Sequence, residues 1–236
     1  MDQIREWDKQ LLIFLNSYHA DWLDPVMILI TKTWFWIPFY IFLLYVIIKN
    51  YKKDAWIVVA VLALLLTLTD QVTSTIMKPY FARLRPSQDP SLFGIIHIVK
   101  DWMTFPATEY RGGKYGFASG HASNTFATAM FAWFLFKNKY RWASLFFLWA
   151  AVMTYTRIYL GVHYPGDILV GGAIGALLGW AAFLFYKWLD EQAKKRKKLI
   201  YVTVKNNLLY GHEKTAVIKY TILGFWHYIK NRYYKL

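Results

Sequence analysis

The sequence predicts an all-α membrane protein: a polytopic bundle of about five transmembrane helices that follows an N-terminal interfacial helix. Hydrophobic residues make up 57% and aromatic residues 20% of the 236-residue chain, which is more than is usual for a soluble domain. Apolar runs with few charges recur at lengths that suit a bilayer, which a helix crosses in about 20 residues. These runs are residues 34–48, 55–77, 118–136, 142–159 and 167–186.

Apolar residues recur at helical spacing near the N-terminus, with charged residues on the opposite face. They are Ile4, Trp7, Leu11, Leu12 and Leu15. The pattern is typical of an amphipathic helix lying in the membrane interface, although an ordinary packing helix would show it too. We therefore expect an interfacial helix over residues 1–20.

A membrane-embedded domain should follow over residues 21–190. Its first helix could begin as early as Asp24 and Pro25. The second apolar run contains Asp70, and a charge at the centre of a membrane helix costs about 3 kcal/mol on insertion scales. We expect Asp70 to hydrogen-bond a neighbouring Ser or Thr. The fifth run carries small residues, including Gly171, Gly175 and Gly179, that permit close helix packing.

Residues 191–236 should form a basic, aromatic tail that is cytoplasmic or interfacial. Within it, residues 201–205 (YVTVK) alternate in the way that a strand does. The chain has no cysteine, which excludes disulfides, thiolate catalysis and Cys-based metal sites. Its first residues mix acids with bases and do not resemble a secretory signal.

Basic residues concentrate after the first, third and fifth apolar runs. They are Lys49, Lys52, Lys53, Lys137, Lys139, Arg141, Lys187 and the run at 194–198. Because Lys and Arg are enriched in cytoplasmic loops, these regions should face the cytoplasm. The polar motifs described next would then face the periplasmic or extracellular side of an inner (cell) membrane. These loops and anionic lipids account for the formal charge of +14, so we expect a lipid bilayer and no nucleic acid as partner.

The first polar motif, KPYFARLRP, follows the second apolar run. Lys78 and Arg85 together suit a phosphate group, because Lys offers a compact charge and Arg a bidentate fork. Alternatively, both cations extend to the lipid headgroups, as cations at helix ends commonly do.

The second motif, GFASGHASNTFA, begins the third apolar run. Gly120 allows close approach of a ligand to the backbone, and free N–H groups at a helix start attract anions. Ser119 can donate a hydroxyl hydrogen bond, or can simply cap the helix. A capped helix has no need of the imidazole of His121.

The third motif, TRIYLGVHYPGD, joins the fourth and fifth runs. His163 precedes Asp167 by four residues, so the carboxylate could bond one ring nitrogen and leave the other free to attack. Arg157 adds a cation. Alternatively, Asp167 caps the last helix and His163 is an ordinary loop residue.

Together the three motifs resemble the phosphatidic acid phosphatase type 2 superfamily, membrane lipid phosphate phosphatases related to bacterial acid phosphatases and vanadium haloperoxidases. The matching residues are Lys78, Arg85 and Pro86; Ser119, Gly120 and His121; and Arg157, His163 and Asp167. The resemblance covers about residues 20–190. Two positions depart from the family pattern, with Ala118 in place of Pro and Thr156 in place of Ser. Neither must carry a proton or a charge, so we expect activity to survive both.

The resemblance implies a nucleophilic role for His163, which would form a phosphohistidine, with Asp167 orienting it. His121 would protonate the leaving oxygen and later activate water. The expected phosphate-binding residues are Lys78, Arg85, Ser119, Gly120 and Arg157. We see no carboxylate cluster suited to Mg²⁺ or Ca²⁺ and no zinc spacing, so we expect no metal and no cofactor.

The substrate should be a membrane lipid phosphate, with undecaprenyl diphosphate and a lipid A phosphate favoured. Three further loop cations, Arg83, Arg111 and Lys114, could serve a diphosphate or a multiply charged headgroup. Phosphatidylglycerophosphate and phosphatidic acid are alternatives. A non-catalytic binder or transporter of lipid phosphates would keep the cations but has no need of two histidines. The sequence does not indicate an oligomeric state.

Overall fold

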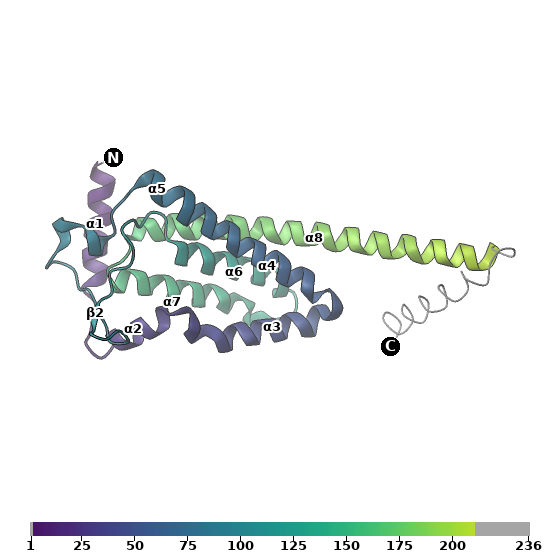
Figure 1. Ribbon diagram of the computed structural model, residues 1–236, viewed down its shortest axis with the longest axis horizontal. Coiled ribbons are helices and arrows are strands. Elements are labelled where there is room, and N and C mark those ends of the chain that lie inside the picture. The colour runs from purple at the N-terminus through teal and green to yellow at the C-terminus, as the bar shows by residue number, and fades with distance from the viewer. Residues whose placement is uncertain (1, 211–236) are drawn as a thin grey trace. The chain divides into compact units, whose positions relative to one another are not determined.

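The computed structural model describes residues 2–210 of the chain, which are mostly helical (Figure 1). The helices are α1 (Asp2–Asn16), α2 (Asp24–Thr31), α3 (Ile37–Tyr51), α4 (Ala55–Asp70), α5 (Lys78–Phe81), α6 (Gly120–Phe136), α7 (Leu145–Tyr159) and α8 (Pro165–Tyr210). Shorter helical segments are η1 (Thr33–Trp36), η2 (Lys52–Asp54), the π-helical η3 (Gln71–Met77), η4 (Pro86–Gln88), η5 (Pro90–Leu92) and η6 (Arg141–Ser144). Two short strands, β1 (Lys100–Asp101) and β2 (Thr108–Glu109), pair antiparallel. The all-α class is therefore confirmed.

The chain divides into two compact units, Met1–Tyr186 and Lys187–Leu236. The described part of the second unit belongs to α8, and the rest of the predicted tail, residues 211–236, lies outside the described residues. The strand-like alternation of residues 201–205 was misleading, because these residues are helical. An isolated alternating segment has no neighbouring strand to pair with, so its pattern does not determine its structure.

Each predicted apolar run overlaps a helix: α3, α4, α6, α7 or α8. Within the part of the chain that the structure describes, two helical stretches, Thr33–Phe81 and Pro165–Val204, are long and apolar enough to cross a membrane. The first contains both α3 and α4, which reverse direction at Lys52, a residue with a φ of 48°. α6 and α7 are 17 and 15 residues long. The number of five crossings therefore stays a prediction.

The glycines of the last run bring α8 very close to α6. A Cβ on Gly171 would lie 2.5 Å from the carbonyl oxygen of Ser119, and one on Gly179 would lie 2.5 Å from that of Ala127. Gly175 faces the Ser123 carbonyl in the same way. The predicted close packing is confirmed, and it fixes the start of α6 against the start of α8.

The ends of the bundle differ in character. Two basic turns, one between α3 and α4 and one between α6 and α7, meet at one end of the bundle. There the Asn50 side chain donates to the Tyr140 hydroxyl at 3.2 Å and accepts from Lys139 at 3.1 Å. α1, α2 and the long loop between α5 and α6 gather at the other end (Figure 1). All three polar motifs belong to elements of this second end.

Helix α1 packs on the bundle and also exposes an apolar surface. Leu12 is fully buried in a cluster with Ile96, Ile158 and other apolar residues. Ile4 and Trp7 are instead 68% and 63% exposed. The predicted single apolar face is thus divided between a packed side and an exposed side, and the interfacial position of α1 stays a prediction.

Asp70 behaves as expected, since its carboxylate accepts a hydrogen bond from the Ser74 hydroxyl at 2.9 Å.

Candidate active site

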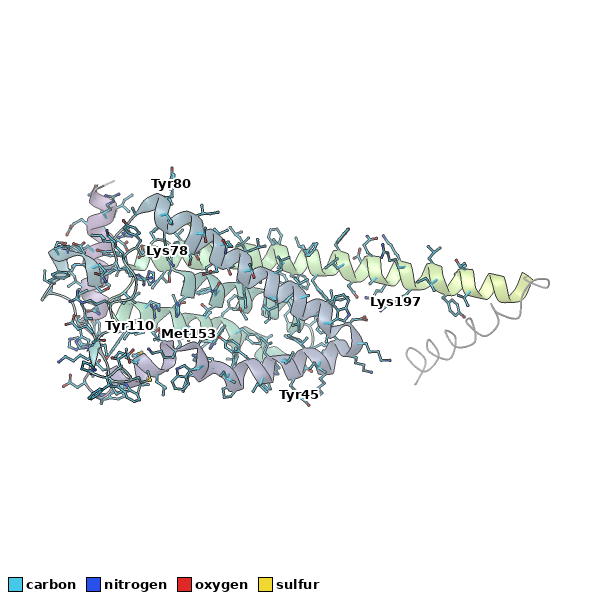
Figure 2. All side chains as sticks on the ribbon, in the orientation of Figure 1. Tyr45, Lys78, Tyr80, Tyr110, Met153 and Lys197 are labelled. Atoms are coloured by element: carbon cyan, nitrogen blue, oxygen red, sulfur yellow. The ribbon has the colours of Figure 1, made fainter. Side chains whose placement is uncertain are left out.

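Lys78 of the first motif points to the start of α6. Its ammonium donates to the Ser74 hydroxyl at 3.0 Å, and a Cβ on Gly120 would lie 3.8 Å from Nζ. Figure 2 shows Lys78 among the helices, whereas Tyr80, two residues further on, projects away from them. Lys78 is therefore directed toward the second motif.

Arg85 of the same motif is buried, with 8% of its surface exposed. Its Nε donates to the Tyr115 carbonyl at 3.1 Å and its Nη1 to the Val162 carbonyl at 3.3 Å. These bonds hold the guanidinium inside the protein. The alternative interpretation, in which Arg85 extends to the lipid headgroups, is therefore wrong.

The second motif forms the N-terminus of α6. Ser119 has an extended backbone conformation, and its hydroxyl accepts a hydrogen bond from the Ala122 amide, so it caps the helix as expected. The Ser119 amide donates to the Asp167 carbonyl at 3.0 Å, which joins the second motif to the third. Gly120 is the first residue of α6 and faces Thr73, Ser74 and Lys78.

Arg157 lies in the last turn of α7 and is 3% exposed. Its Nη1 donates to the Thr31 hydroxyl at 2.6 Å and to the Tyr110 hydroxyl at 3.2 Å. Among the described residues, its buried Nε has no hydrogen-bond partner. A buried, unpaired donor on a charged group is costly, and an anionic ligand would satisfy it.

His163 lies between Arg85 and Asp167 and is 1% exposed. Its Nε2 is 2.9 Å from Arg85 Nη1, and its Nδ1 is 3.3 Å from Asp167 Oδ2. A guanidinium can only donate hydrogen bonds, so Nε2 must be the acceptor. The neutral ring then carries its proton on Nδ1, facing the carboxylate, and its Nε2 lone pair faces the cations.

The surroundings favour the neutral form of this ring. Burial lowers the pKa of His163 well below its ordinary value, and the charges of Arg85, Arg157 and Lys78 lower it further. Burial, followed by the charge of Arg157, lowers the pKa of Arg85 to about 10, which leaves the guanidinium protonated at neutral pH. A neutral imidazole beside fixed cations is the state in which a histidine can attack phosphorus.

Asp167, in the first turn of α8, is fully buried and uses both oxygens. Oδ2 accepts from the Tyr164 amide at 3.1 Å and faces His163. Oδ1 accepts from Arg83 Nη1 at 2.9 Å. The carboxylate thus bonds the backbone at the start of α8 and also faces the His163 ring. The two interpretations of Asp167 from the sequence, helix cap and histidine partner, are compatible.

Gly116 is a site residue that the sequence analysis missed. A Cβ at this position would lie 2.9 Å from Asp167 Oδ2 and 3.5 Å from His163 Nδ1. A larger residue would therefore press on the pair. A glycine in a long loop near three motifs was the available signal, but glycines are common in loops.

His121 is less enclosed than His163. It is the second residue of α6, is partly exposed, and interacts electrostatically with Arg157 and His163. It also interacts with the backbone of Thr31, at the end of α2. Thr31, like Tyr110, gave no sequence signal, because hydroxyl residues outside the motifs are frequent.

The structure thus brings the predicted site residues to one end of the bundle. Tyr110, the loop partner of Arg157, lies at this end with Lys78 (Figure 2). The further loop cations are engaged differently, because Arg83 pairs with carboxylates and Arg111 donates to Glu109 and to the Ser87 carbonyl. Within residues 2–210, no group of three or more His, Cys, Asp or Glu residues is arranged to hold a metal ion.

Comparison with known proteins identifies the family of this chain and several relatives. The family model of the PAP2 superfamily matches residues 54–191. A lipid A 4′-phosphatase of Bacteroides thetaiotaomicron is 40% identical over 182 residues, which cover 76% of this chain and 75% of that protein. A lipid A 4′-phosphatase of Porphyromonas gingivalis is 34% identical over 210 residues, covering 85% of this chain and 84% of that protein.

A solved structure has the same fold. The transmembrane PAP2 type phosphatidylglycerolphosphate phosphatase of Bacillus subtilis superimposes with a TM-score of 0.55 and 22% sequence identity. The superposition covers 81% of this chain and 88% of that one.

Proposed function

The chain belongs to the PAP2 superfamily and is a lipid phosphatase, and from this premise we propose that it removes a phosphate group from lipid A through a phosphohistidine at His163. The observation that carries the proposal is the buried His163 ring, with Nε2 2.9 Å from Arg85 and Nδ1 facing Asp167. This geometry supports attack on phosphorus by a ring nitrogen of His163 rather than by a hydroxyl group.

The names of two well-matched relatives support lipid A over undecaprenyl diphosphate. Both relatives named as lipid A 4′-phosphatases match over three quarters or more of their own length. Arg83 and Arg111, which could have served the further charges of either substrate, are held by Asp167 and by Glu109 and so do not distinguish the two lipids. The cations that remain directed at His163 are Lys78, Arg85 and Arg157.

In the first step, His163 Nε2 attacks phosphorus, a P–N bond forms, and the bond from phosphorus to the lipid oxygen breaks. The leaving oxygen takes a proton from His121. The Nδ1 proton stays on the ring, where Asp167 stabilises the positive charge that develops. A dianionic phosphate beside His121 favours the protonated imidazole that this step requires.

In the second step, His121 takes a proton from a water molecule, whose oxygen attacks phosphorus. The P–N bond breaks, inorganic phosphate leaves, and His163 returns to its neutral form. Both transition states spread charge over the equatorial oxygens of the phosphoryl group, and stabilising that charge is the main demand of the reaction.

The phosphoryl oxygens would be held by Lys78, Arg85 and Arg157, with the Ser119 hydroxyl and the Gly120 amide. Arg157 Nε, which is buried without a partner among the described residues, supports a contact of this kind. Arg85 would exchange its bond with Nε2 for a phosphoryl oxygen as the lone pair of Nε2 turns to phosphorus.

The site would face the periplasm. It lies at the end of the bundle opposite the two basic turns, which meet through Asn50 and Tyr140. Because such turns are enriched on the cytoplasmic side, this separation supports an active site on the outer face of an inner membrane.

The test is a panel of lipids presented to purified protein in detergent: lipid A, undecaprenyl diphosphate, phosphatidylglycerophosphate and phosphatidic acid. We expect kcat/KM to be highest for lipid A, with release of the 4′-phosphate identified by mass spectrometry, and no release above background by His163→Gln. A higher kcat/KM for any other lipid would refute the substrate. Equal rates for His163→Gln and wild type would refute the mechanism.

A further inference from the structure

Helix α1 turns two polar side chains, Asp8 and Asn16, into the bundle beside the buried Leu12. Asp8, Leu12 and Asn16 follow one another at intervals of four residues, so they lie on one face of the helix. Leu12 is fully buried, Asn16 is 1% exposed, and the Asp8 side chain is 12% exposed. α1 lies outside residues 54–191, the part that the family model matches.

The carboxylate of Asp8 makes two short contacts with the elements of the site. Oδ2 accepts from Arg83 Nη2 at 2.7 Å, and Oδ1 accepts from the Gly166 amide at 2.7 Å. A Cβ on Gly166 would lie 2.7 Å from Asp8 Oδ2, so this approach depends on the glycine. Asp8 thereby holds both the first motif and the start of α8.

Arg83 carries this contact through to the candidate nucleophile. Its Nη1 donates to Asp167 Oδ1 at 2.9 Å, and its guanidinium lies 3.9 Å over the Tyr164 ring. A guanidinium is planar and rigid, so fixing one nitrogen on Asp8 fixes the direction of the other. With Oδ1 of Asp167 held in this way, Oδ2 is turned to His163 Nδ1.

We propose that Asp8 is a positioning residue of the phosphatase reaction, acting through Arg83 to set the orientation of Asp167 behind His163. The proposal rests on the function proposed above. Asp8 does not touch the phosphate. It limits the rotation of the carboxylate that orients the nucleophile, and small losses of orientation in such a site cost large factors in rate. Its loss should lower kcat and leave KM nearly unchanged.

The experiment compares Asp8→Asn with wild type in detergent, with lipid A as substrate. Asp8→Asn keeps the size of the side chain but loses its charge, and we expect a fall in kcat of about tenfold with KM within about twofold. Asp8→Glu, which keeps the charge, should recover part of this loss. Glu6→Gln is the matched control, since Glu6 is an exposed carboxylate of the same helix that bonds Gln10, and it should match wild type.

A double-mutant cycle distinguishes positioning from general packing of α1. If Asp8 acts through Arg83, then adding Asp8→Asn to Arg83→Gln should lower kcat by less than about twofold. A multiplicative fall in the double variant would overturn the proposal, as would an Asp8→Asn enzyme with wild-type kcat. Should neither Asp8 variant fold, Arg83→Lys carries the test, because it keeps the charge but loses the two-pronged contact. It should lose about tenfold in kcat, and wild-type kcat would contradict the proposal.

His163→Gln is measured beside these variants. Activity retained by His163→Gln would end the proposed mechanism itself. An inactive His163→Gln together with an unimpaired Asp8→Asn would end the role of Asp8 alone.

Discussion

The two histidines of the site differ in how completely they are enclosed and in whether a carboxylate faces them. His163 is 1% exposed and lies between Arg85 and Asp167, with Gly116 packed against the pair. His121 lies in the first turn of α6, partly exposed, and none of the described hydrogen bonds joins it to a carboxylate. A nucleophile benefits from a fixed ring and one defined tautomer. A group that exchanges protons with a leaving oxygen and with water needs access instead.

The largest effect should come from the enclosed histidine. We expect His163→Gln to lower kcat with lipid A by at least about 10⁴-fold, because the ring nitrogen that forms the P–N bond is then missing. Phosphate release with quantified enzyme measures this. If His163→Gln kept a rate within about tenfold of wild type, His163 would not be the nucleophile and the proposed difference between the two histidines would be wrong.

The open histidine should give a smaller and different loss. His121→Gln should lower kcat with lipid A by roughly 10²- to 10⁴-fold, the usual contribution of a general acid and base. With p-nitrophenyl phosphate, whose leaving group needs little protonation, we expect a burst of nitrophenolate followed by slow turnover. Stopped-flow absorbance would detect the burst. Its absence would mean that His121 is needed for attack as well.

Removing one cation should change the pH profile of the reaction. Burial and nearby cations, including Lys78, hold the pKa of His163 low. In Lys78→Gln this pKa rises, so protonation begins to inactivate the nucleophile at a higher pH. The acidic limb of kcat/KM should therefore move to higher pH, and the rate should fall by roughly 10²-fold through loss of a phosphate contact. Lys114→Gln, an exposed loop cation, should leave the limb in place; equal shifts in both variants would contradict the assignment.

The smallest predicted effect concerns the space around the enclosed pair. Gly116→Ala would place a methyl group 2.9 Å from Asp167 Oδ2, and we expect kcat to fall about tenfold as the pair is displaced. Gly113→Ala is the control, because a Cβ there meets nothing within 4 Å. Steady-state kinetics of both variants, with thermal unfolding as a check on folding, decides the matter. Equal kcat values for Gly116→Ala and Gly113→Ala would show that the added methyl group does not disturb Asp167 and His163.

The sequence predicted the helical class, the apolar runs and the residues of the three motifs, because each of these is written in local patterns. A run of apolar residues predicts a helix wherever it lies, and the motif spacing identifies the charged groups directly. Gly171, Gly175 and Gly179 were also read correctly, since small residues at intervals of four form one packing face.

The partners of the motif residues could not be predicted in the same way. Thr31 bonds Arg157 across 126 positions of the chain, and Arg83 bonds Asp8 across 75. Such contacts depend on how α1 and α2 pack over the bundle. Thr and Asp are common residues, so their presence in the sequence does not indicate these distant partners. Arg83 was interpreted as a possible substrate contact for the same reason, because a cation in a loop does not reveal which anion it meets.

The most direct measurement identifies the covalent intermediate in His121→Gln. This variant is mixed with p-nitrophenyl phosphate, quenched in alkali to preserve phosphohistidine, and mapped by mass spectrometry. We expect one phosphate on the peptide that contains His163, and no phosphate in the His121→Gln/His163→Gln double variant. Phosphate on any other residue, or a burst of nitrophenolate without phosphate on His163, would contradict the proposed mechanism.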